Sequence, residues 1–382
     1  MANPPLNIAM LGSKFMGKAH SNAWLKAAKF FDLPATPVLH TVAARNAEEL
    51  ELFAAQWGWQ HSTTRWKNAV TSDEVDLVDI GTPNRMHAPQ AIAALEAGKH
   101  VACEKPLAGT LADARTMRDA ARKAKGKTFV WYSYRGVPAV ALAQQLVAEG
   151  FVGRMYHVRA AYLQGWGGPD TPLTWRFRGR EAGSGAHGDL NAHIIDMARF
   201  ITGDEIVEIA GAIEQRFITE RPLPEEPKQT GRSTVDDAVL FLARFRNGAV
   251  GSFEATRLAI GIKNSNRIEI HGEKGAIRFN FERMNELEIY DADRDGRTAG
   301  WTTIYTMHPS HPWADNWWPD GHGLGYEHTF VNLAGDIVRS IAGEPTTVAL
   351  PDFADAYETQ RVMEAALVSA RNHTAVRLSE VR

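Results

Sequence analysis

The sequence predicts an α/β protein in which an N-terminal, doubly wound parallel sheet precedes an α+β domain built on a mostly antiparallel open sheet. Two patterns and the length lead to this prediction. Strand-like apolar runs alternate with helical segments over about the first 130 residues, whereas strand-like runs follow one another after about residue 150. The length of 382 residues exceeds one ordinary core and suggests two domains.

The N-terminal part carries strand and helix patterns in turn. Helices are predicted at residues 15–29, from 46 onward, at 88–97, where Gly98 is a natural left-handed stop, and at 111–123. Because strands that alternate with helices form parallel βαβ units, we expect residues 1–130 to form a Rossmann domain. The five predicted strands are residues 7–11, 38–43, 75–80, 100–104 and 128–132.

The remaining residues, 131–382, are expected to form the α+β domain, whose last helix, around 362–370, is free to pack on the first domain. Asn247-Gly248 is a hairpin signal between two strand-like runs. Residues 222–231 are expected to form an exposed loop. The predicted strands of this domain are residues 154–164, 206–217, 236–246, 249–256, 267–272 and 276–281.

The composition excludes several classes of partner. The 42 Lys and Arg against 45 Asp and Glu give a net charge of −3, which offers no basic surface for nucleic acid or an anionic membrane. No apolar stretch reaches the roughly 18 residues of a membrane span. The single cysteine, Cys103, excludes an internal disulfide and a multi-cysteine zinc site. With no basic leader pattern at the start, we expect a cytoplasmic protein.

The turn after the first predicted strand is a candidate nucleotide site. It keeps the first and third glycines of a G-x-G-x-x-G fingerprint, Gly12 and Gly17, and has Lys14 in place of the second. The first glycine permits the tight turn and the third permits close packing of helix on strand. An ammonium at position 14 could approach phosphate oxygens instead. The residues expected to contact the cofactor here are Gly12, Ser13, Lys14, Phe15, Met16 and Gly17.

The end of the second strand leaves the choice between NAD and NADP open. The acidic residue that normally holds the ribose 2′-hydroxyl is absent, and Ala44 and Arg45 stand there instead. Arg45 either meets a 2′-phosphate, which favours NADP, or is an exposed residue at a helix start.

Two later segments carry residues suited to acid–base chemistry. Lys105 ends a parallel strand, where open α/β sheets place their ligand crevices, and can bind a hydroxyl or pass a proton. Asp189, His193 and Asp196 share one face if their stretch is helical, and a nearby lysine would keep the imidazole neutral. The alternatives are a surface lysine before Pro106 and an Asp/His cap-and-core pair. Asp196 is expected to orient His193 or to be buried structure.

These segments, with the glycine turn and residues 82–87, resemble the Gfo/Idh/MocA oxidoreductases over almost the whole chain. The motifs 20–24, 43–46, 131–140 and 325–330 look like the levoglucosan dehydrogenase branch, whose members suggest NAD. The resemblance implies that residues 1–130 bind the dinucleotide and that residues 131–382 bind substrate and form homodimers or homotetramers through the antiparallel sheet. It implies catalytic roles for Lys105, His193 and Asp189. The further cofactor contacts that it implies are Thr82, Pro83, Asn84, His87, Glu104 and Lys105.

Several weaker candidates complete the expected substrate site. Arg176 either binds ring oxygens or stacks on Trp175, and Ser133 replaces an asparagine that the family often carries. The His- and Trp-rich stretch 308–328 either packs on a sugar ring, fills a long loop or makes a subunit contact. Its His-x-x-His spacing lacks further ligands, so no metal is expected. The residues expected to bind substrate are Lys105, Tyr134, Arg135, Trp175, Arg176, Asp189, His193, Tyr326 and His328.

The sequence therefore predicts an NAD(P)-dependent oxidoreductase acting on a secondary alcohol of a cyclic sugar, an anhydrosugar or a cyclitol. His193 would take the hydroxyl proton while a hydride passes to the nicotinamide, and Lys105 would hold the oxygen. The alternative is a glycosidase that oxidises its sugar transiently, eliminates the glycoside and re-reduces the product. A non-catalytic sensor is disfavoured because Lys105, Asp189 and His193 are all retained.

Overall fold

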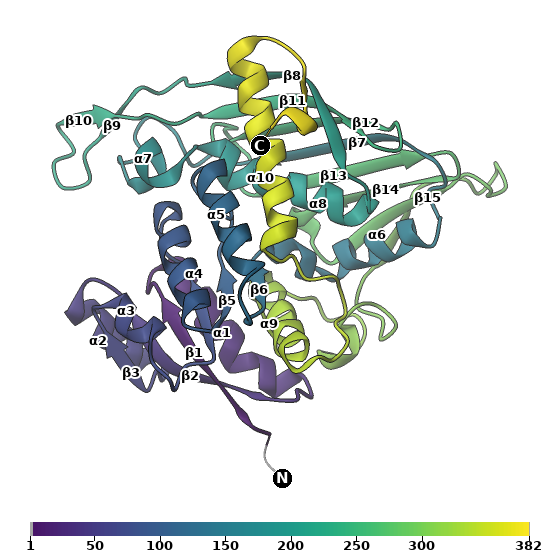
Figure 1. Ribbon diagram of the computed structural model, residues 1–382. Helices are drawn as coiled ribbons and strands as arrows, with labels where there is room; N and C mark the ends of the chain where they lie inside the picture. The colour runs from purple at the N-terminus through teal and green to yellow at the C-terminus, as the bar shows by residue number, and fades with distance from the viewer. Residues whose placement is uncertain (1–2, 382) are drawn as a thin grey trace. The chain divides into compact units, whose positions relative to one another are not determined.

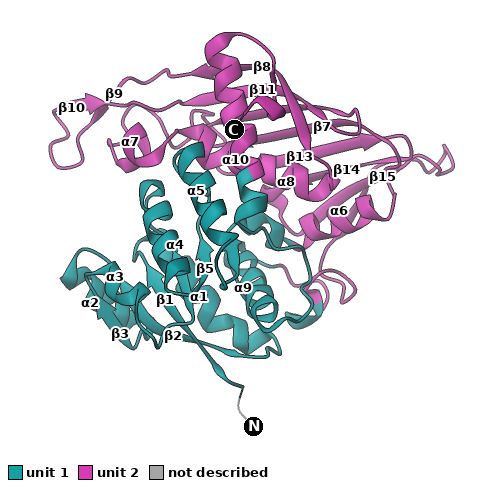
Figure 2. Ribbon diagram, viewed as in Figure 1, with its two compact units in different colours: residues 1–137, 315–318, 324–357 teal, residues 138–314, 319–323, 358–382 magenta. Residues whose placement is uncertain are grey.

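The computed structural model describes residues 3–381, which form two compact units (Figure 2). Unit 1 contains the chain up to residue 137 together with 315–318 and 324–357. Unit 2 contains residues 138–314, 319–323 and those from 358 onward. The chain passes from unit 1 to unit 2 for the last time inside its final long helix, α10 (Phe353–Asn372).

Unit 1 is built on a six-stranded sheet in which every strand pair is parallel. Its strand order is β3-β2-β1-β4-β5-β6, the order of a dinucleotide-binding fold. All four side chains of β4 are buried, as expected for a parallel strand with both faces covered. The strands are β1 (Pro5–Leu11), β2 (Thr36–Ala43), β3 (His61–Thr63), β4 (Leu77–Ile80), β5 (His100–Cys103) and β6 (Thr128–Val130).

The helices of unit 1 begin and end at recognisable signals. The side chains of Asn46 and Thr110 cap α2 and α5 by accepting hydrogen bonds from backbone N–H groups three residues on. Gly98 takes a positive φ of 76° just after α4, as the sequence predicts. Helix α9 returns from late in the sequence to pack against α1. The helices are α1 (Phe15–Phe30), α2 (Ala47–Trp57), α3 (Trp66–Val70), α4 (His87–Glu96), α5 (Leu111–Ala121) and α9 (Tyr326–Ala342).

Unit 2 is built on a nine-stranded mixed sheet with the order β16-β15-β14-β13-β7-β12-β11-β8-β17. Only β7 and β12 pair in parallel; the other neighbours are antiparallel. Gly248, with φ of 92°, makes the predicted hairpin between β11 and β12. The strands are β7 (Met155–Leu163), β8 (Ile206–Gln215), β11 (Ala238–Phe245), β12 (Val250–Thr256), β13 (Ser265–Gly272), β14 (Gly275–Asn280), β15 (Glu286–Asp291), β16 (Thr302–Tyr305) and β17 (Val376–Arg377).

Helices cover one face of this sheet (Figure 1). They are α6 (Pro138–Ala148), α8 (Ala192–Thr202) and the later part of α10, and every residue of α8 is buried. Along β11 the side chains alternate between buried and exposed, so that Phe241 points inward and stacks on Phe253 of β12 at 4.7 Å. The opposite face therefore presents the alternate side chains of the same strands.

The structure confirms the predicted fold class and adds elements that the sequence did not indicate. Strand β3 is short and largely exposed, so it lacks an apolar run. The predicted loop at 222–231 contains parts of a small antiparallel pair, β9 (Glu220–Pro222) and β10 (Thr230–Arg232). Strands β15 and β16 extend the second sheet by one hairpin. No helix in the described part of the chain is long and apolar enough to cross a membrane.

Gly185 provides a test of packing in unit 2. A Cβ atom there would collide with the backbone carbonyl oxygen of Asp236, whereas a Cβ on Gly168 would meet nothing within 4 Å. We expect Gly185→Ala to lower the free energy of unfolding by about 3 kcal/mol because the backbone must move. Gly168→Ala, the control, should change it by less than about 0.5 kcal/mol. Urea unfolding measures both, and equal stabilities for the two variants would contradict the close approach.

Candidate active site

The glycine turn after β1 lies against the turn after β4. A Cβ on Gly12, whose φ is +115°, would lie 2.8 Å from the carbonyl oxygen of Gly81, and one on Gly17 would lie 2.5 Å from that of Gly12. Because β1 has β2 on one side and β4 on the other, this is the point where the strand order reverses. A dinucleotide binds at such a point, and a turn that only glycine can form fits its pyrophosphate.

The side chains around this turn are partly committed to other partners. The ammonium of Lys14 is exposed and pairs with Glu49 of α2. Phe15 is also exposed, and its ring stacks against Tyr326 at 6.2 Å. Ser13 and Met16 are half-buried.

The end of β2 places Arg45 in the solvent. Ala44 donates its N–H to the carbonyl oxygen of Thr63 at 3.3 Å, and Arg45 immediately precedes Asn46, the cap of α2. Arg45 is therefore an exposed residue at a helix start, and its position is consistent with either nicotinamide cofactor.

His87 ties the turns after β4 and β5 together. Its Nε2 lies 2.9 Å from the carbonyl oxygen of Thr82 and its Nδ1 lies 3.1 Å from that of Pro106. Burial lowers the pKa of His87. The Thr82 hydroxyl donates to Gln90 at 2.6 Å, and Asn84 starts a short 3-10 turn. The residues predicted to contact the cofactor after β4 are thus held in one rigid turn.

Glu104 and Lys105 follow β5 directly. The N–H of Glu104 donates to the Ile80 carbonyl oxygen at 2.8 Å, which continues the pairing of β5 with β4. The Glu104 side chain is buried and Lys105 is half-buried. Glu104 Oε2 accepts the backbone N–H of Lys105 at 3.0 Å. The sheet therefore fixes the backbone from which the Lys105 side chain extends.

His20 and Asp79 belong to the same region, although the sequence did not identify them as site residues. His20 lies on α1 and Asp79 on β4, and both are fully buried. The His20 ring lies between the carboxylates of Asp79 and Glu104, at 3.0 Å and 3.2 Å. The available signal was a pair of aspartates, Asp76 and Asp79, inside the otherwise apolar run 75–80, together with a histidine on the first helix.

Asp189 and His193 lie in unit 2, where a π-helical turn (His187–Asn191) leads into α8. The expectation that these residues share one face was conditional on a helix in this stretch. The carboxylate of Asp236 accepts the N–H groups of Gly185 at 2.6 Å and His187 at 2.8 Å, which holds the start of the turn. The wider π turn has i→i+5 hydrogen bonding, so the spacing of Asp189 and His193 differs from that in a regular helix.

Arg257 is a site residue that the sequence reasoning missed. It follows β12, is 3% exposed, and donates to Asp189 Oδ2 from Nη2 at 2.9 Å and from Nε at 3.2 Å. The guanidinium also lies 5.1 Å from the ring of Trp166, within range of a cation–π contact. Because both N–H groups donate to the same oxygen, Oδ2, Arg257 holds the Asp189 side chain in place through a charge-assisted contact.

His193 is buried beside Tyr162, whose hydroxyl group forms hydrogen bonds of its own. The ring of Tyr162, on β7, lies 5.9 Å from that of His193. The Tyr162 hydroxyl donates to Asn264 at 2.7 Å, and Gln164 donates to the same oxygen at 2.7 Å. Asp196 lies further along α8 and is 2% exposed. The ends of β7 and β12 thus surround the start of α8 with hydrogen-bonding groups.

The weaker candidates divide between the two units. In unit 1, Tyr134 is buried, and the buried Arg135 binds Asp355 at 2.5 Å and the carbonyl oxygen of Ala349 at 3.1 Å. In unit 2, the guanidinium of Arg176 stacks on Trp175 at 4.6 Å. The structure therefore shows the Trp-Arg stack that was one of the two expectations for this pair.

The tryptophan-rich segment is largely engaged in packing. Trp317 lies 4.3 Å from Phe30 and donates its N–H to Asn332 at 2.8 Å. His328, near the start of α9, packs edge-on against Trp317 at 4.5 Å and accepts the N–H of Gly325. Within residues 3–381, no three His, Cys, Asp or Glu side chains are grouped as metal ligands.

The predicted residues therefore form two groups. The cofactor turns, Lys105, Tyr134, Arg135, Tyr326 and His328 belong to unit 1, and Trp175, Arg176, Asp189 and His193 belong to unit 2. In unit 1 the first group can bind an anionic dinucleotide next to the ammonium of Lys105. In unit 2 the second group offers an imidazole and an arginine-bound carboxylate.

Comparison with known proteins agrees with this arrangement. A family model described as an oxidoreductase family with an NAD-binding Rossmann fold matches residues 6–132, and one described as a Gfo/Idh/MocA C-terminal domain matches residues 140–278. Levoglucosan dehydrogenase from Pseudarthrobacter phenanthrenivorans is 41% identical, covering 98% of this chain and 99% of that protein.

Solved structures extend the likeness to three dimensions. An oxidoreductase domain protein from Kribbella flavida aligns with a TM-score of 0.94 at 48% identity, over 99% of this chain and 100% of that one. A levoglucosan dehydrogenase in complex with NADH and levoglucosan aligns with a TM-score of 0.93 at 41% identity, over 98% of this chain and 99% of that one. The chain therefore belongs to the Gfo/Idh/MocA family of NAD-binding oxidoreductases, as a member of its sugar and polyol dehydrogenases.

Proposed function

We propose that this protein is an NAD-dependent dehydrogenase of an anhydrosugar of the levoglucosan type or of a closely similar pyranose. The observation that carries the proposal is the combination of Lys105 at the end of β5 with His193 and the Arg257-bound Asp189 at the start of α8. This set belongs to a chain whose likeness to a levoglucosan dehydrogenase covers 98% of its length.

The proposed chemistry gives each of these residues one task. Bound NAD⁺ supplies the acceptor for a hydride that leaves the carbinol carbon. His193 accepts the proton of the same hydroxyl group, so that one proton and one hydride leave the alcohol and a ketone remains. Lys105 donates a hydrogen bond to the hydroxyl oxygen and stabilises its developing negative charge. Asp189, held by Arg257, accepts a hydrogen bond from the reacting hydroxyl or its neighbour.

We propose NAD rather than NADP as the cofactor. Arg45 stands exposed beside the cap of α2, where a helix start alone accounts for it. The related levoglucosan dehydrogenase was solved with NADH. As part of the same proposal we place the enzyme in the cytoplasm, since its single cysteine is buried and its fold uses no disulfide.

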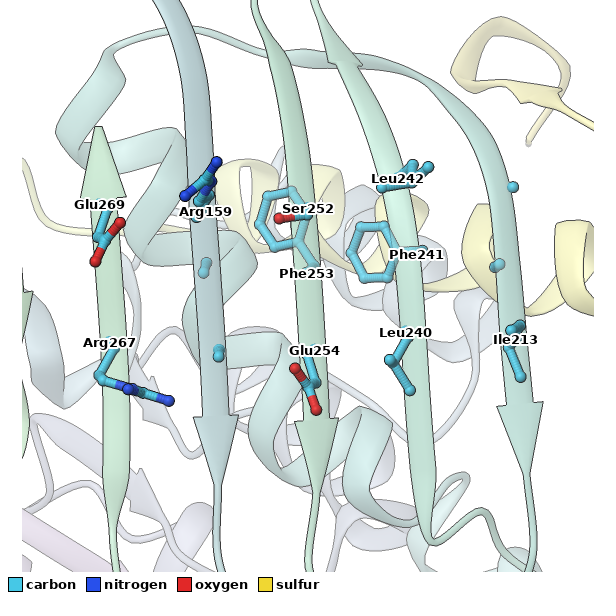
Figure 3. Close-up of a pocket in the computed structure, with 14 residues that line it drawn as sticks. Arg159, Ile213, Leu240, Phe241, Leu242, Ser252, Phe253, Glu254, Arg267 and Glu269 are labelled. Carbon is cyan, nitrogen blue, oxygen red and sulfur yellow. The ribbon is translucent and has the colours of Figure 1, made fainter. Parts of the chain in front are cut away.

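We further propose that a second copy of this chain covers the face of the large sheet opposite its helices (Figure 3). The part of this face on β8 and β11 is apolar: Ile213 and Leu242 are 64% and 58% exposed, and Leu240 lies opposite Ile213 on the neighbouring strand. Charges of both signs lie to one side of it, on β12, β7 and β13, and this combination suits a surface that pairs with itself (Figure 3). The charged residues are Arg159, Glu254, Arg267 and Glu269.

A substrate panel tests the proposed reaction. The purified protein is assayed with NAD⁺ and with NADP⁺ against levoglucosan, glucose, other pyranoses and myo-inositol, following absorbance at 340 nm. We expect the highest kcat/KM with levoglucosan and NAD⁺. Glycosides are included because cleavage without net NADH formation, in the absence of any polyol oxidation, would instead support the redox glycosidase. Preference for NADP⁺ would contradict the cofactor assignment.

Lys105→Met tests the proposed role of the ammonium. We expect kcat to fall about 10²–10⁴-fold, because the hydroxyl oxygen loses its hydrogen-bond donor and positive charge. The affinity for NADH, measured by fluorescence titration, should stay within about 3-fold of the wild type. Lys99→Met removes a half-buried lysine from the other end of β5 and serves as the control. Wild-type kcat in Lys105→Met would show that the lysine takes no part in the reaction.

Leu242→Glu tests the sheet face. A carboxylate at the centre of the apolar patch should dissociate the homo-oligomer to monomers at micromolar concentration, because burying an unpaired charge is costly. Leu52→Glu, at a leucine of α2 that is 69% exposed, is the matched control and should leave the assembly intact. Light scattering after size exclusion gives both masses. A monomeric wild type, or an unchanged oligomer in Leu242→Glu, would contradict the proposal.

A further inference from the structure

A buried cluster of ionisable side chains in unit 1 lies next to Lys105. His20 and Asp79 are 0% exposed and Glu104 is 5% exposed. The three come from different elements, α1, β4 and the residue after β5. Because charged groups are rarely buried unless they are paired, the hydrogen bonds of this cluster determine which of its members carry a proton.

The hydrogen bonds of Asp79 identify it as an acceptor at both oxygens. The indole N–H groups of Trp24 and Trp131 donate to Oδ2 at 2.7 Å and to Oδ1 at 2.9 Å. An indole nitrogen can only donate, so neither contact needs a proton on Asp79. His20 Nδ1 lies 3.0 and 3.1 Å from the same two oxygens and therefore donates its hydrogen to the carboxylate.

The contact of the other ring nitrogen with Glu104 then requires a proton between the two atoms. Nε2 lies 3.2 Å from Glu104 Oε1. If Nδ1 carried the only ring proton, a lone pair on Nε2 would face a lone pair of the carboxylate in a buried site. A proton on the line between these two atoms removes the repulsion and forms a charge-assisted hydrogen bond.

Glu104 also forms a hydrogen bond with Lys105. Its second carboxylate oxygen, Oε2, accepts the backbone N–H of Lys105 at 3.0 Å. One continuous chain of hydrogen bonds therefore runs from Asp79 through His20 and Glu104 to the backbone of Lys105. Nothing in the backbone pairing of β5 alone would fix the orientation of the Glu104 side chain.

We propose that His20 is a positioning residue, an imidazolium held between Asp79 and Glu104 that orients Glu104 and, through it, Lys105. The proposal rests on the proposed function only in assigning Lys105 its role in hydride transfer. The charge of His20 and its hydrogen bonds belong to unit 1 alone and are testable without any substrate.

The surroundings of the ring favour the charged form. Burial lowers the pKa of His20, but the charge of Asp79 and the hydrogen bonds to Asp79 and Glu104 outweigh it and raise the pKa from 6.5 to about 9. The remaining ring contacts are aromatic and uncharged: Trp131 at 4.5 Å and Phe330 of α9 at 5.5 Å. The stabilisation from the proton is complete below about pH 6.5 and is lost as the pH rises through about 9.

The first experiment measures the proton directly. The protein is labelled with ¹⁵N-histidine, and the ring signals of His20 are assigned by their loss in His20→Gln. We expect both ring nitrogens to be protonated from pH 6 to 8, with a change only near pH 9. A single protonated ring nitrogen at pH 7 would overturn the proposal. Activity plays no part in this measurement, so its result stands even where the proposed reaction fails.

The second experiment separates positioning from simple structural support. We expect His20→Gln to lower kcat about 10²-fold, because a neutral amide with a single nitrogen cannot donate to both carboxylates as the imidazolium does. KM and the Kd for NADH should stay within about 3-fold of the wild type. His40→Gln is the control: it removes another largely buried histidine, which lies on β2 and faces Glu74 at 3.5 Å, and it should leave kcat unchanged.

Glu104→Gln provides a second test that does not depend on whether His20→Gln folds. In Glu104→Gln the new amide can donate to a neutral His20 and still accept the Lys105 N–H, so the hydrogen bonds survive without the extra proton. We expect one His20 ring nitrogen to lose its proton by pH 8 in this variant, while the melting temperature stays near that of the wild type. A His20 that remains doubly protonated there would overturn the proposed sharing. Normal kcat in folded His20→Gln would also overturn it, and would leave the role of Lys105 untouched.

Discussion

The buried carboxylate of Asp79 is the constraint on which unit 1 depends. A charge in the middle of a parallel strand cannot reach water, so it must find its donors inside the protein. Its three donors come from two separate places in the chain: His20 and Trp24 lie on α1, and Trp131 follows β6. Helix α1 is therefore held against β4 by polar contacts as well as by packing, and the turn that begins this helix is the glycine turn of the nucleotide site.

Unit 2 also contains a buried carboxylate, that of Asp236, whose hydrogen-bond donors lie inside the protein. Asp236 is 2% exposed and accepts two backbone N–H groups at the entrance to the π-helical turn. Asn191 then closes the turn by donating to Nδ1 of His187 and to the carbonyl oxygen of Val239. The turn carries Asp189, and its shape follows from these side-chain contacts with β11 and the residues before it. In unit 2, Asp236 thus holds the segment that bears Asp189, whereas in unit 1 Asp79 reaches the segment that bears Lys105 only through His20 and Glu104.

The parts of the structure that the sequence predicted are those that depend on local patterns. Strands buried on both faces read as apolar runs, and Gly12 and Gly248 mark their turns with backbone conformations that few other residues adopt. Strand β3 was not predicted because its residues, His61–Thr63, are polar and mostly exposed and therefore form no apolar run. The π turn was not predicted because Asp236, whose carboxylate holds the start of the turn, lies 49 residues away from His187 in the chain.

The same distinction applies to the candidate site. Lys105 was recognisable because it ends a strand next to a proline, within a motif that can be read along the chain. His20 is 59 residues from Asp79 and 84 from Glu104, and Arg257 is 68 residues from Asp189, so only the folded chain brings these partners together.

Part of the set of 11 tryptophans in this chain shares one hydrogen-bonding role. Five of them donate their indole N–H to a side-chain oxygen, and four of those acceptors lie in unit 1. An indole supplies a large apolar surface and one donor that never competes as an acceptor, which suits a buried carboxylate or amide better than a hydroxyl would. A fold that buries an acid such as Asp79 needs hydrogen-bond donors around it. An indole supplies such a donor without adding another charge to the core. Four of these indoles therefore satisfy polar groups inside unit 1, and two of the four serve the single acid Asp79.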